Sequence, residues 1–301
     1  MSPGRLRRLK RLPGRLQRRA RAARATLQER RFEPRLRLDP DAPELLLSPH
    51  WDDAVLGCWS VLAGERPLQV VNVFGGIPPA GERTAWEEII GARDTAERAR
   101  RRLAEDALAL GKAGRTALNL PLLDAQLRPP AVAIGLHDID RALAAHVAGA
   151  SRVYAPAGIG GHADHLLARR YACALVHVGI PVELYAELPY CTFHGWPPWV
   201  DGSEPEPQRN VDAYWLSFLG GVAAMPPLRS ASVLRLDPSA AQARAQAIGC
   251  YETSLNHGVR KVLADPAIHA LEVRWSLVRK GKATRSGGEG AEATAPAVAR
   301  S

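Results

Sequence analysis

The sequence has 301 residues, of which 46% are hydrophobic and 24% charged, and its formal net charge is +9 at pH 7. This length allows one sizeable α/β domain with a full core, and four scattered cysteines without a Cys-x-x-Cys spacing argue against a disulfide scaffold. Because the N-terminus lacks the apolar core of a signal peptide and no apolar run is long enough to span a membrane, we expect a cytoplasmic protein.

The positive charge is concentrated in an N-terminal arm, residues 1–38. This arm holds 14 Lys and Arg against two Glu, so residues 39–301 are mildly acidic. Its leucines recur at roughly helical spacing but form only a thin apolar face, and no aromatic residue precedes Phe32. We expect a helical or disordered, solvated extension, with peripheral contact at the inner face of a membrane, or with a partner, as the alternative. The lack of interleaved aromatic residues argues against nucleic acid as a partner.

The first polar cluster of the body follows a short strand. Leu45-Leu46-Leu47 is typical of a strand buried on both faces, and the run ends in Ser48-Pro49-His50-Trp51-Asp52-Asp53. Open α/β sheets bind ligands just outside the carboxyl ends of their strands, so this His-x-Asp-Asp cluster is a candidate metal or acid/base site. The simpler alternative is that Asp52 or Asp53 caps the helix expected over residues 54–63.

A second polar cluster follows the strand predicted at residues 153–156. A glycine-rich turn, residues 158–161, leads into His162-Ala163-Asp164-His165, whose two histidines at the start of a helix share one face. The two clusters thus place three His and three Asp at the ends of two strands. Zinc binds imidazole nitrogen and carboxylate oxygen, and a catalytic zinc keeps one position open for water. The sequence therefore predicts a catalytic metal site.

Strands and helices alternate through the rest of the body. Strands are predicted at residues 68–74, 116–120, 182–186 and 272–275, and helices at 84–110 (starting at Thr84 or at Asp94), 134–148, 166–178 and 240–253. Residues 191–230 have little regular pattern but are rich in aromatic side chains, which we expect either to form a substrate wall or to cover a sheet edge. Residues 281–301 are predicted to be a disordered tail.

The two clusters resemble the signatures of the PIG-L/LmbE-like family of zinc-dependent N-acetyl-sugar deacetylases. Ser48–Asp53 resembles its (A/S)-(H/P)-H-x-D-D motif, and His162–His165 resembles its H-x-D-H motif. The likeness covers a domain of residues 39–280. It implies an α/β, Rossmann-like three-layer sandwich with a mostly parallel sheet and the active site at the carboxyl ends of the strands.

The sequence departs from the family pattern at two positions. Ala54 stands where many relatives have Glu, and Gly160 stands where some deacetylases have a Tyr two residues before the first His of the second motif. The second change would remove a hydrogen-bond donor to the transition state, unless a residue elsewhere replaces it. Residues 102–107 resemble the family's R-x-x-E-D-A helix, and we expect their charges to form structural salt links.

The resemblance implies a metal centre held by His50, Asp53 and His165. The expected ion is Zn²⁺, although the same ligands would hold Fe²⁺ or Co²⁺. A zinc ion there would lower the pKa of its bound water from 15.7 to about 7.

The resemblance also implies roles for three catalytic residues. Asp52 would be the general base that takes a proton from the attacking water. His162, as an imidazolium, would stabilise the oxyanion or protonate the departing amine. Asp164 would orient His162 and raise its pKa, or would only occupy the first turn of its helix.

Weaker expectations concern contacts with the substrate. Residues 122–124 and 187–190 resemble family segments that follow strands, and residues 191–230 hold the aromatic side chains on which sugar rings could pack. The candidate substrate-binding residues are Asp124, Glu187, His194 and Trp196. For Asp124 a role in a turn is the alternative.

The implied function is hydrolysis of an N-acyl group, foremost N-acetyl, on an amino sugar or sugar conjugate, including lipid-linked and nucleotide-linked sugars. One alternative is an amidase that acts on a thiol conjugate or another non-sugar amide. Another is a non-catalytic, metal-bearing sugar-binding module recruited through the arm. Asp52 argues against the module, because binding alone needs no base beside the metal.

Overall fold

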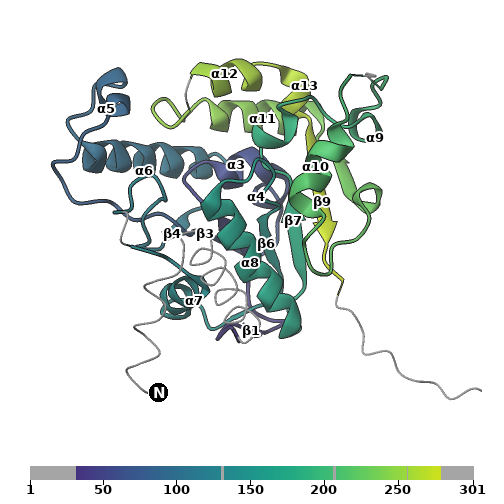
Figure 1. Cartoon of the computed structure of the whole chain (residues 1–301), viewed down its shortest axis with the longest axis horizontal. Helices are drawn as coiled ribbons and strands as arrows, with labels where there is room; N and C mark the ends of the chain where they lie inside the picture. Colours follow the sequence, from purple (N-terminus) through teal and green to yellow (C-terminus); the bar gives the residue numbers. More distant parts are fainter. Residues whose placement is uncertain (1–31, 130–131, 206–207, 256, 279–301) are drawn as a thin grey trace, which may run out of the picture.

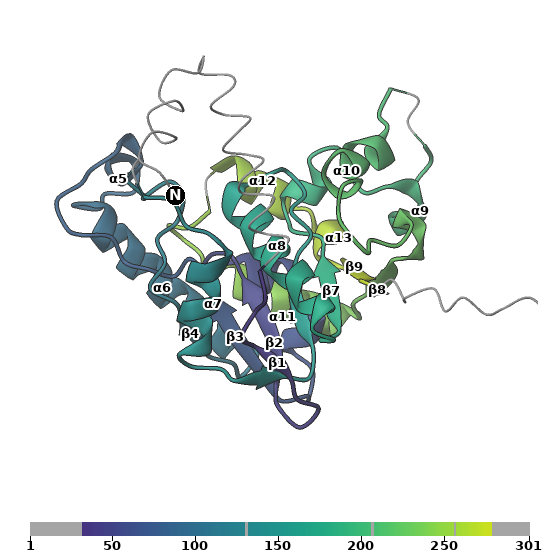
Figure 2. The same cartoon turned by 60° about the horizontal axis from the view of Figure 1, so that its bottom comes forward.

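A mostly parallel, seven-stranded sheet forms the centre of the computed structural model, which describes residues 32–129, 132–205, 208–255 and 257–278 (Figures 1 and 2). The strand order is β4-β3-β2-β6-β7-β9-β8. The first five strands are parallel: β4 (Ala117–Asn119), β3 (Leu68–Asn72), β2 (Glu44–Ser48), β6 (Val153–Pro156) and β7 (Val182–Tyr185). Antiparallel β9 (Leu271–Ser276) and β8 (Ser232–Arg235) complete one edge. The predicted α/β class with a mostly parallel sheet is confirmed.

The winding of the chain reverses at β2. From β2 the chain reaches β3 through α3 (Asp53–Gly57) and α4 (Trp59–Leu62), and then β4 through α5 (Ala85–Ile89) and α6 (Thr95–Gly111). It returns past β2 through α7 (Leu136–Ala144) to β6, and through α8 (Ala163–His177) to β7. Parallel crossovers are right-handed, so these two sets of helices cover opposite faces, with α7 and α8 in contact on one of them (Figure 1). The carboxyl ends of β2 and β6 therefore flank the switch point where ligands bind in such sheets.

The strand β2 is buried along its whole length because a neighbour pairs with it on each side. Leu46 lies opposite Val70 of β3 and Tyr154 of β6, and every residue of β2 is buried. A continuous apolar run is what a central parallel strand requires. The polar residues after Ser48 therefore follow a fully buried, central strand of the sheet.

Two helices predicted as continuous are interrupted. The helix expected to begin at Thr84 or Asp94 is two helices, and each of these residues caps one of them: Thr84 forms a capping box with Glu87, and the Asp94 carboxylate accepts the Glu97 N–H at 2.7 Å. The helix predicted over residues 54–63 breaks at Cys58 between α3 and α4. Local caps thus decided the boundaries that apolar periodicity alone left open.

The body begins earlier than the boundary predicted at residue 38. Phe32 and Leu36 are buried in the core, and β1 (Arg37–Leu38) pairs with β5 (Gly149–Ala150). The rest of the predicted arm and the predicted tail lie outside the described residues, so their roles stay predictions. Within the described part of the chain, the structure shows no helix with the length and apolarity needed to cross a membrane.

The aromatic residues of segment 191–230 mostly cover the edge of the sheet. This segment contains η2 (Tyr190–Thr192), α9 (Pro198–Asp201), α10 (Val211–Leu219) and η3 (Leu228–Ser230). Trp215 is fully buried, with its ring 6.1 Å from that of Trp196 and 5.5 Å from that of Trp275 on β9. Its indole N–H donates to the carbonyl of Cys191. Burial against β9 requires these side chains for packing rather than for a ligand.

A buried arginine ties the C-terminal helices to the segment that carries the first polar cluster. Arg244 lies on α11 (Pro238–Ile248), which packs against α3 and α6; α12 (His257–Leu263) and α13 (Pro266–His269) follow it. Its guanidinium donates to the carbonyls of Val55, Leu56 and Leu271 and lies 3.7 Å from the Glu272 carboxylate.

Replacing Arg244 by Met is expected to lower the free energy of unfolding by about 3–5 kcal/mol, because it removes the positive charge of Arg244 from beside the buried Glu272 carboxylate. Urea denaturation measures this change. The matched control is Arg229→Met, since the Arg229 side chain is 73% exposed in its pair with Asp212 and an exposed pair contributes about 0–1 kcal/mol. Equal effects of the two substitutions would contradict the prediction.

Candidate metal centre

The turn after β2 is built to present three polar side chains to one cavity. The Ser48 hydroxyl donates to the His50 carbonyl at 2.6 Å and accepts the Ala54 N–H at 3.0 Å. Asp52 has φ 130°, a region that non-glycine residues rarely adopt, and its carboxylate makes no capping bond to α3. The capping alternative therefore does not describe Asp52, and such strained residues cluster at functional sites.

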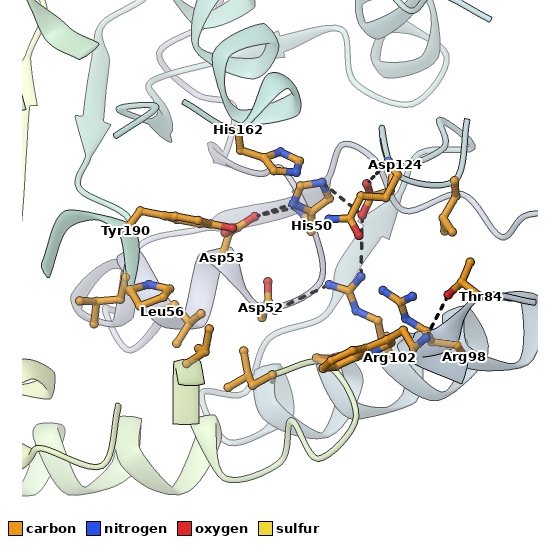
Figure 3. A pocket seen from close by; sticks show the side chains of 18 residues that line it. His50, Asp52, Asp53, Leu56, Thr84, Arg98, Arg102, Asp124, His162 and Tyr190 are labelled. Atoms are coloured by element: carbon orange, nitrogen blue, oxygen red, sulfur yellow. Dashed lines mark hydrogen bonds and ion pairs between the residues drawn. The ribbon is translucent and has the colours of Figure 1, made fainter. Parts of the chain in front are cut away.

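The predicted metal ligands His50, Asp53 and His165 are brought together at the switch point (Figure 3). Asp53 Oδ2 lies 3.3 Å from His50 Nδ1 and 3.3 Å from His165 Nε2. The ring nitrogens of His50, His162 and His165 also lie within 4.8 Å of one another. Two imidazole nitrogens and a carboxylate oxygen around one small volume suit a divalent transition metal.

The electrostatics of this group favour a cation. His165 Nε2 is buried and makes no well-aligned hydrogen bond within the described part of the chain. Although burial opposes it, the Asp53 and Glu187 carboxylates raise the pKa of His165 to about 10. The imidazoles of His165 and His50 in turn hold the pKa of Asp53 well below its usual range, against the effect of burial. A metal ion would take the place of the proton, so the residues fit the predicted centre.

Two buried carboxylates set which nitrogen of each histidine faces the metal position. Glu187 Oε1 lies 3.1 Å from His165 Nδ1, and Asp164 Oδ2 lies 3.1 Å from His50 Nε2. Because an ionised carboxylate only accepts hydrogen bonds, these nitrogens carry the protons. When a metal ion replaces the second proton of each imidazole, the lone pairs of His50 Nδ1 and His165 Nε2 would face that ion.

Replacing Glu187 by Gln is expected to weaken zinc binding about 10–100-fold, the usual effect of losing a partner that orients a metal ligand. Competition against a chromophoric chelator measures the dissociation constant. Glu65→Gln is the matched control because Glu65 is exposed. Unchanged affinity in Glu187→Gln would show that Glu187 does not orient His165.

The structure contradicts the expected pairing of Asp164 with His162. The Asp164 carboxylate faces His50, accepts the Ala125 N–H at 2.7 Å and pairs with Arg128. His162 instead caps α8, where its Nδ1 accepts the Asp164 backbone N–H at 3.4 Å. Burial and the nearby His50 and His165 lower the pKa of His162 to about 4, opposite to the expected rise. The side chain of Asp164 points from the first turn of α8 towards the loop after β4, and chain spacing could not show this.

Asp52 lies beside the candidate metal position, and its carboxyl group has a raised pKa. Burial, together with the neighbouring Asp53 carboxylate, raises the pKa of Asp52 to about 7, against the opposing charge of Arg102. Arg102 Nη2 lies 3.7 Å from Asp52 Oδ2. A carboxylate with a pKa near the ambient pH can both accept a proton and release it.

A cavity of about 310 Å³ opens over these residues. Its wall includes Asp124, whose carboxylate lies 3.6 Å from His50 Nε2 and 3.8 Å from Arg102 Nη1. The full lining is His50, Asp52, Asp53, Leu56, Thr84, Trp86, Arg98, Arg102, Asp124, Gln126, Leu127, His162, Leu188, Pro189, Tyr190, Ser254, Leu255 and Val259.

The other three candidate substrate residues lie away from this wall. Glu187 is fully buried behind His165 and accepts the Gly158 N–H at 2.6 Å. His194 and Trp196 line a separate hollow of about 200 Å³, and Trp196 packs on Trp215. The chain beyond β7 places Glu187 against His165, whereas the aromatic segment follows the sheet edge.

Arg102 and Tyr190 are two of the cavity residues that sequence reasoning missed. Arg102, expected to form a structural salt link, stacks on Trp51 and faces Asp52 and Asp124, whereas Glu105 of the same motif binds the loop at residues 253–254. Tyr190 lies against His165 with ring centroids 5.5 Å apart. Both belong to segments that resemble the family, but only the long-range packing shows that they reach the cavity.

No protein-family model matches the sequence. The chain is similar to the 2'-N-acetylparomamine deacetylase of Streptomyces fradiae, with 36% identity over an alignment of 169 residues, which covers 48% of this chain and 57% of the relative. It therefore spans little more than half the length of that curated relative.

Solved structures of deacetylases share the fold. The zinc-inhibited form of teicoplanin deacetylase Orf2 has a TM-score of 0.58 and 22% identity over 80% of this chain and 100% of that chain. The A40926 pseudoaglycone deacetylase Dbv21 has a TM-score of 0.54 and 24% identity over 81% of this chain and 99% of that chain. At these identities the likeness shows the fold alone.

Proposed function

We propose that this chain is a metal-dependent N-deacetylase that hydrolyses the acetamide of an N-acetylated amino sugar. The observation that carries the proposal is the buried Asp52 carboxylate, with a pKa near 7, beside the group of His50, Asp53 and His165. A metal-bearing binding module would need no base at this position. The similarity to a curated deacetylase supports the same conclusion.

The proposed ligand atoms are His50 Nδ1, Asp53 Oδ2 and His165 Nε2. A Zn²⁺, Fe²⁺ or Co²⁺ ion bound there would supply Lewis acidity and bring the pKa of water close to neutrality. Asp164 and Glu187 hold the two imidazoles in the required tautomers.

Asp52 and His162 handle protons on either side of the acetamide. Asp52 takes a proton from the attacking water as the new C–O bond forms, and passes it to the amine nitrogen as the C–N bond breaks, so the products are acetate and amine. The Nδ1 atom of His162 accepts a backbone N–H, so its Nε2 carries the proton. Neutral His162 therefore donates a hydrogen bond to the carbonyl oxygen as that oxygen becomes negative, in place of the imidazolium first expected.

The opposite part of the cavity suits sugar hydroxyl groups. Arg102 lies within 3.5–3.8 Å of Trp51, Asp52 and Asp124, so several of its N–H groups make only long contacts. A guanidinium and the Asp124 carboxylate offer donors and acceptors for neighbouring hydroxyl groups. The volume of about 310 Å³ suits one sugar ring rather than a polymer.

The names of the similar proteins narrow the panel of substrates. They are deacetylases of 2'-N-acetylparomamine, of teicoplanin and of the A40926 pseudoaglycone. We propose an N-acetylglucosamine-type ring attached to a larger scaffold, with free, nucleotide-linked and lipid-linked N-acetylglucosamine as the other forms to be compared. We also propose a cytoplasmic location, with a solvated arm, and with peripheral contact of the arm with a membrane as the alternative.

The test measures release of acetate and of free amine from 2'-N-acetylparomamine and from the three forms of N-acetylglucosamine, with the full zinc-loaded chain. We expect release from at least one of them, abolished by a chelator and restored by zinc. Failure with all four substrates, at one bound zinc per chain, would refute amino-sugar deacetylation. Release from a simple non-sugar acetamide alone would support the amidase alternative.

A further inference from the structure

Tyr190 brings a phenol to the side of the metal position opposite Arg102. It begins η2, lines the cavity, and packs its ring edge-to-face against His165 at 5.5 Å and Phe193 at 5.6 Å. Figure 3 shows Tyr190 and Arg102 on opposite sides of His50, with the phenol directed towards Asp53. Tyr190 is therefore placed to act at the metal side of a bound acetamide rather than on the sugar.

The glycine-rich turn makes room for this ring. Gly160 has φ +88°, and a Cβ atom at this position would lie 2.8 Å from Tyr190 Cδ1 and 2.9 Å from Tyr190 Cβ. Atoms of a side chain at residue 160 and the ring of Tyr190 cannot occupy the same volume. The absence of a side chain at Gly160 is thus what allows the ring of Tyr190 to lie in the cavity.

The hydroxyl group of Tyr190 is available to a ligand. The backbone of Tyr190 is held, because the Tyr214 hydroxyl donates to the Tyr190 carbonyl at 3.2 Å. The Tyr190 hydroxyl itself makes no hydrogen bond to any part of the chain that the structure describes. The ordinary pKa of a tyrosine phenol is about 10, so the group is protonated at neutral pH and can donate.

We propose that Tyr190 is a catalytic residue whose hydroxyl donates a hydrogen bond to the acetamide carbonyl oxygen as that oxygen becomes negative. This inference rests on the proposed deacetylation. Water adds to the carbonyl carbon and Asp52 takes its proton, while the Tyr190 hydroxyl keeps its own proton throughout. When the carbonyl re-forms and the C–N bond breaks, the oxygen loses its charge and the hydrogen bond weakens. The interaction is therefore strongest in the transition state.

A purely structural role would need only the ring. The ring of Tyr190 packs against His165, Phe193 and Gly160, and phenylalanine would make the same contacts. Tyr190→Phe thus separates the hydroxyl from the ring. Tyr171→Phe is the matched control, since Tyr171 is a buried tyrosine whose hydroxyl lies 3.2 Å from Asp140, outside the cavity.

The first measurement compares steady-state kinetics of the zinc-loaded chain and its variants on the best substrate found. Tyr190→Phe is expected to lower kcat by about 10²-fold or more, with KM changed less than about threefold, since one donor to the oxyanion is lost. Tyr171→Phe is expected to keep kcat. Zinc content and thermal melting confirm that Tyr190→Phe is folded and loaded.

The second measurement needs no turnover. Methylphosphonate offers a tetrahedral, negatively charged oxygen, and calorimetry gives its affinity for the zinc-loaded chain. Tyr190→Phe is expected to weaken this binding at least about tenfold, as for loss of a hydrogen bond to a charged group. If no substrate is hydrolysed but Tyr190→Phe still weakens phosphonate binding, the proposed deacetylation is refuted and the role of Tyr190 as a hydrogen-bond donor is supported. If kcat and phosphonate affinity both stay unchanged in Tyr190→Phe, the role of Tyr190 as a hydrogen-bond donor is refuted, and the proposed deacetylation is unaffected.

Discussion

Replacing His165 by alanine is expected to eliminate tight zinc binding and to lower the rate of amide hydrolysis by at least about 10³-fold. His165 Nε2 is one of two imidazole nitrogens proposed to hold the ion, and bound zinc brings the pKa of water from 15.7 to about 7. Two ligands in place of three cannot hold the ion against a chelator. The loss of affinity should exceed the roughly 10–100-fold effect expected for Glu187→Gln.

Zinc content after gel filtration and competition against a chelator measure this effect, and acetate release measures turnover. His177→Ala is the matched control, since His177 is an exposed residue at the end of the same helix. A His165→Ala variant that keeps one tightly bound zinc and full activity would show that the metal centre has a different ligand set. Loss of zinc in both variants would point to a change in the helix rather than in a ligand.

Replacing Asp52 by asparagine is expected to lower kcat by about 10²–10⁴-fold while zinc stays bound. Asparagine has the same shape and tolerates the positive φ of this position, but it cannot take a proton from water. Asp53 and the two histidines, which are the proposed ligands, remain unchanged. Loss of turnover at full zinc content is therefore the signature of a base rather than of a ligand.

Asp265→Asn is the matched control for this substitution, because Asp265 caps α13 outside the cavity and asparagine caps equally well. Turnover of Asp52→Asn within about threefold of the unmodified chain would refute the role of Asp52 as the base. Loss of zinc in Asp52→Asn would instead make Asp52 part of the ligand set.

The same variant has a second consequence, for the stability of the metal-free chain. The pKa of Asp52 is about 7 in the folded chain and 3.8 in the reference state. A carboxyl group whose pKa rises on folding destabilises the folded state as pH increases from about 4 to about 7, and the loss persists above pH 7. Asp52→Asn removes this loss, so its free energy of unfolding at pH 8 should exceed that of the unmodified chain, with little difference at pH 4. Urea denaturation at both pH values measures this.

Local sequence determined where the two polar clusters stand. The run Leu45-Leu46-Leu47 is apolar on both faces because β2 is paired on both sides, and this pattern is typical of a central parallel strand. Parallel strands end at one edge, so the residues after β2 and β6 had to meet there. The proximity of His50, Asp53 and His165 follows from these two facts, although their role as ligands stays a proposal.

Contacts between side chains of distant segments could not be predicted from the sequence alone. Asp164 faces His50 and Glu187 faces His165, although the first pair is 114 residues apart in the sequence and the second pair is 22 residues apart. The substrate residues predicted in the aromatic segment also lie outside the cavity. Trp196 is buried and packs at the edge of the sheet. Composition marked these side chains as notable but did not show their direction.

The sequence by itself determined the class of fold, the edge of the sheet that carries the polar clusters and the chemistry of the residues in them. These properties depend on apolar periodicity and on residue type, which are local. Only the tertiary structure decided that Arg102 and Tyr190 face the cavity from opposite sides, and that Gly160 leaves the space that Tyr190 fills. Such contacts join segments far apart in the chain, and they are fixed by the packing of whole elements against one another.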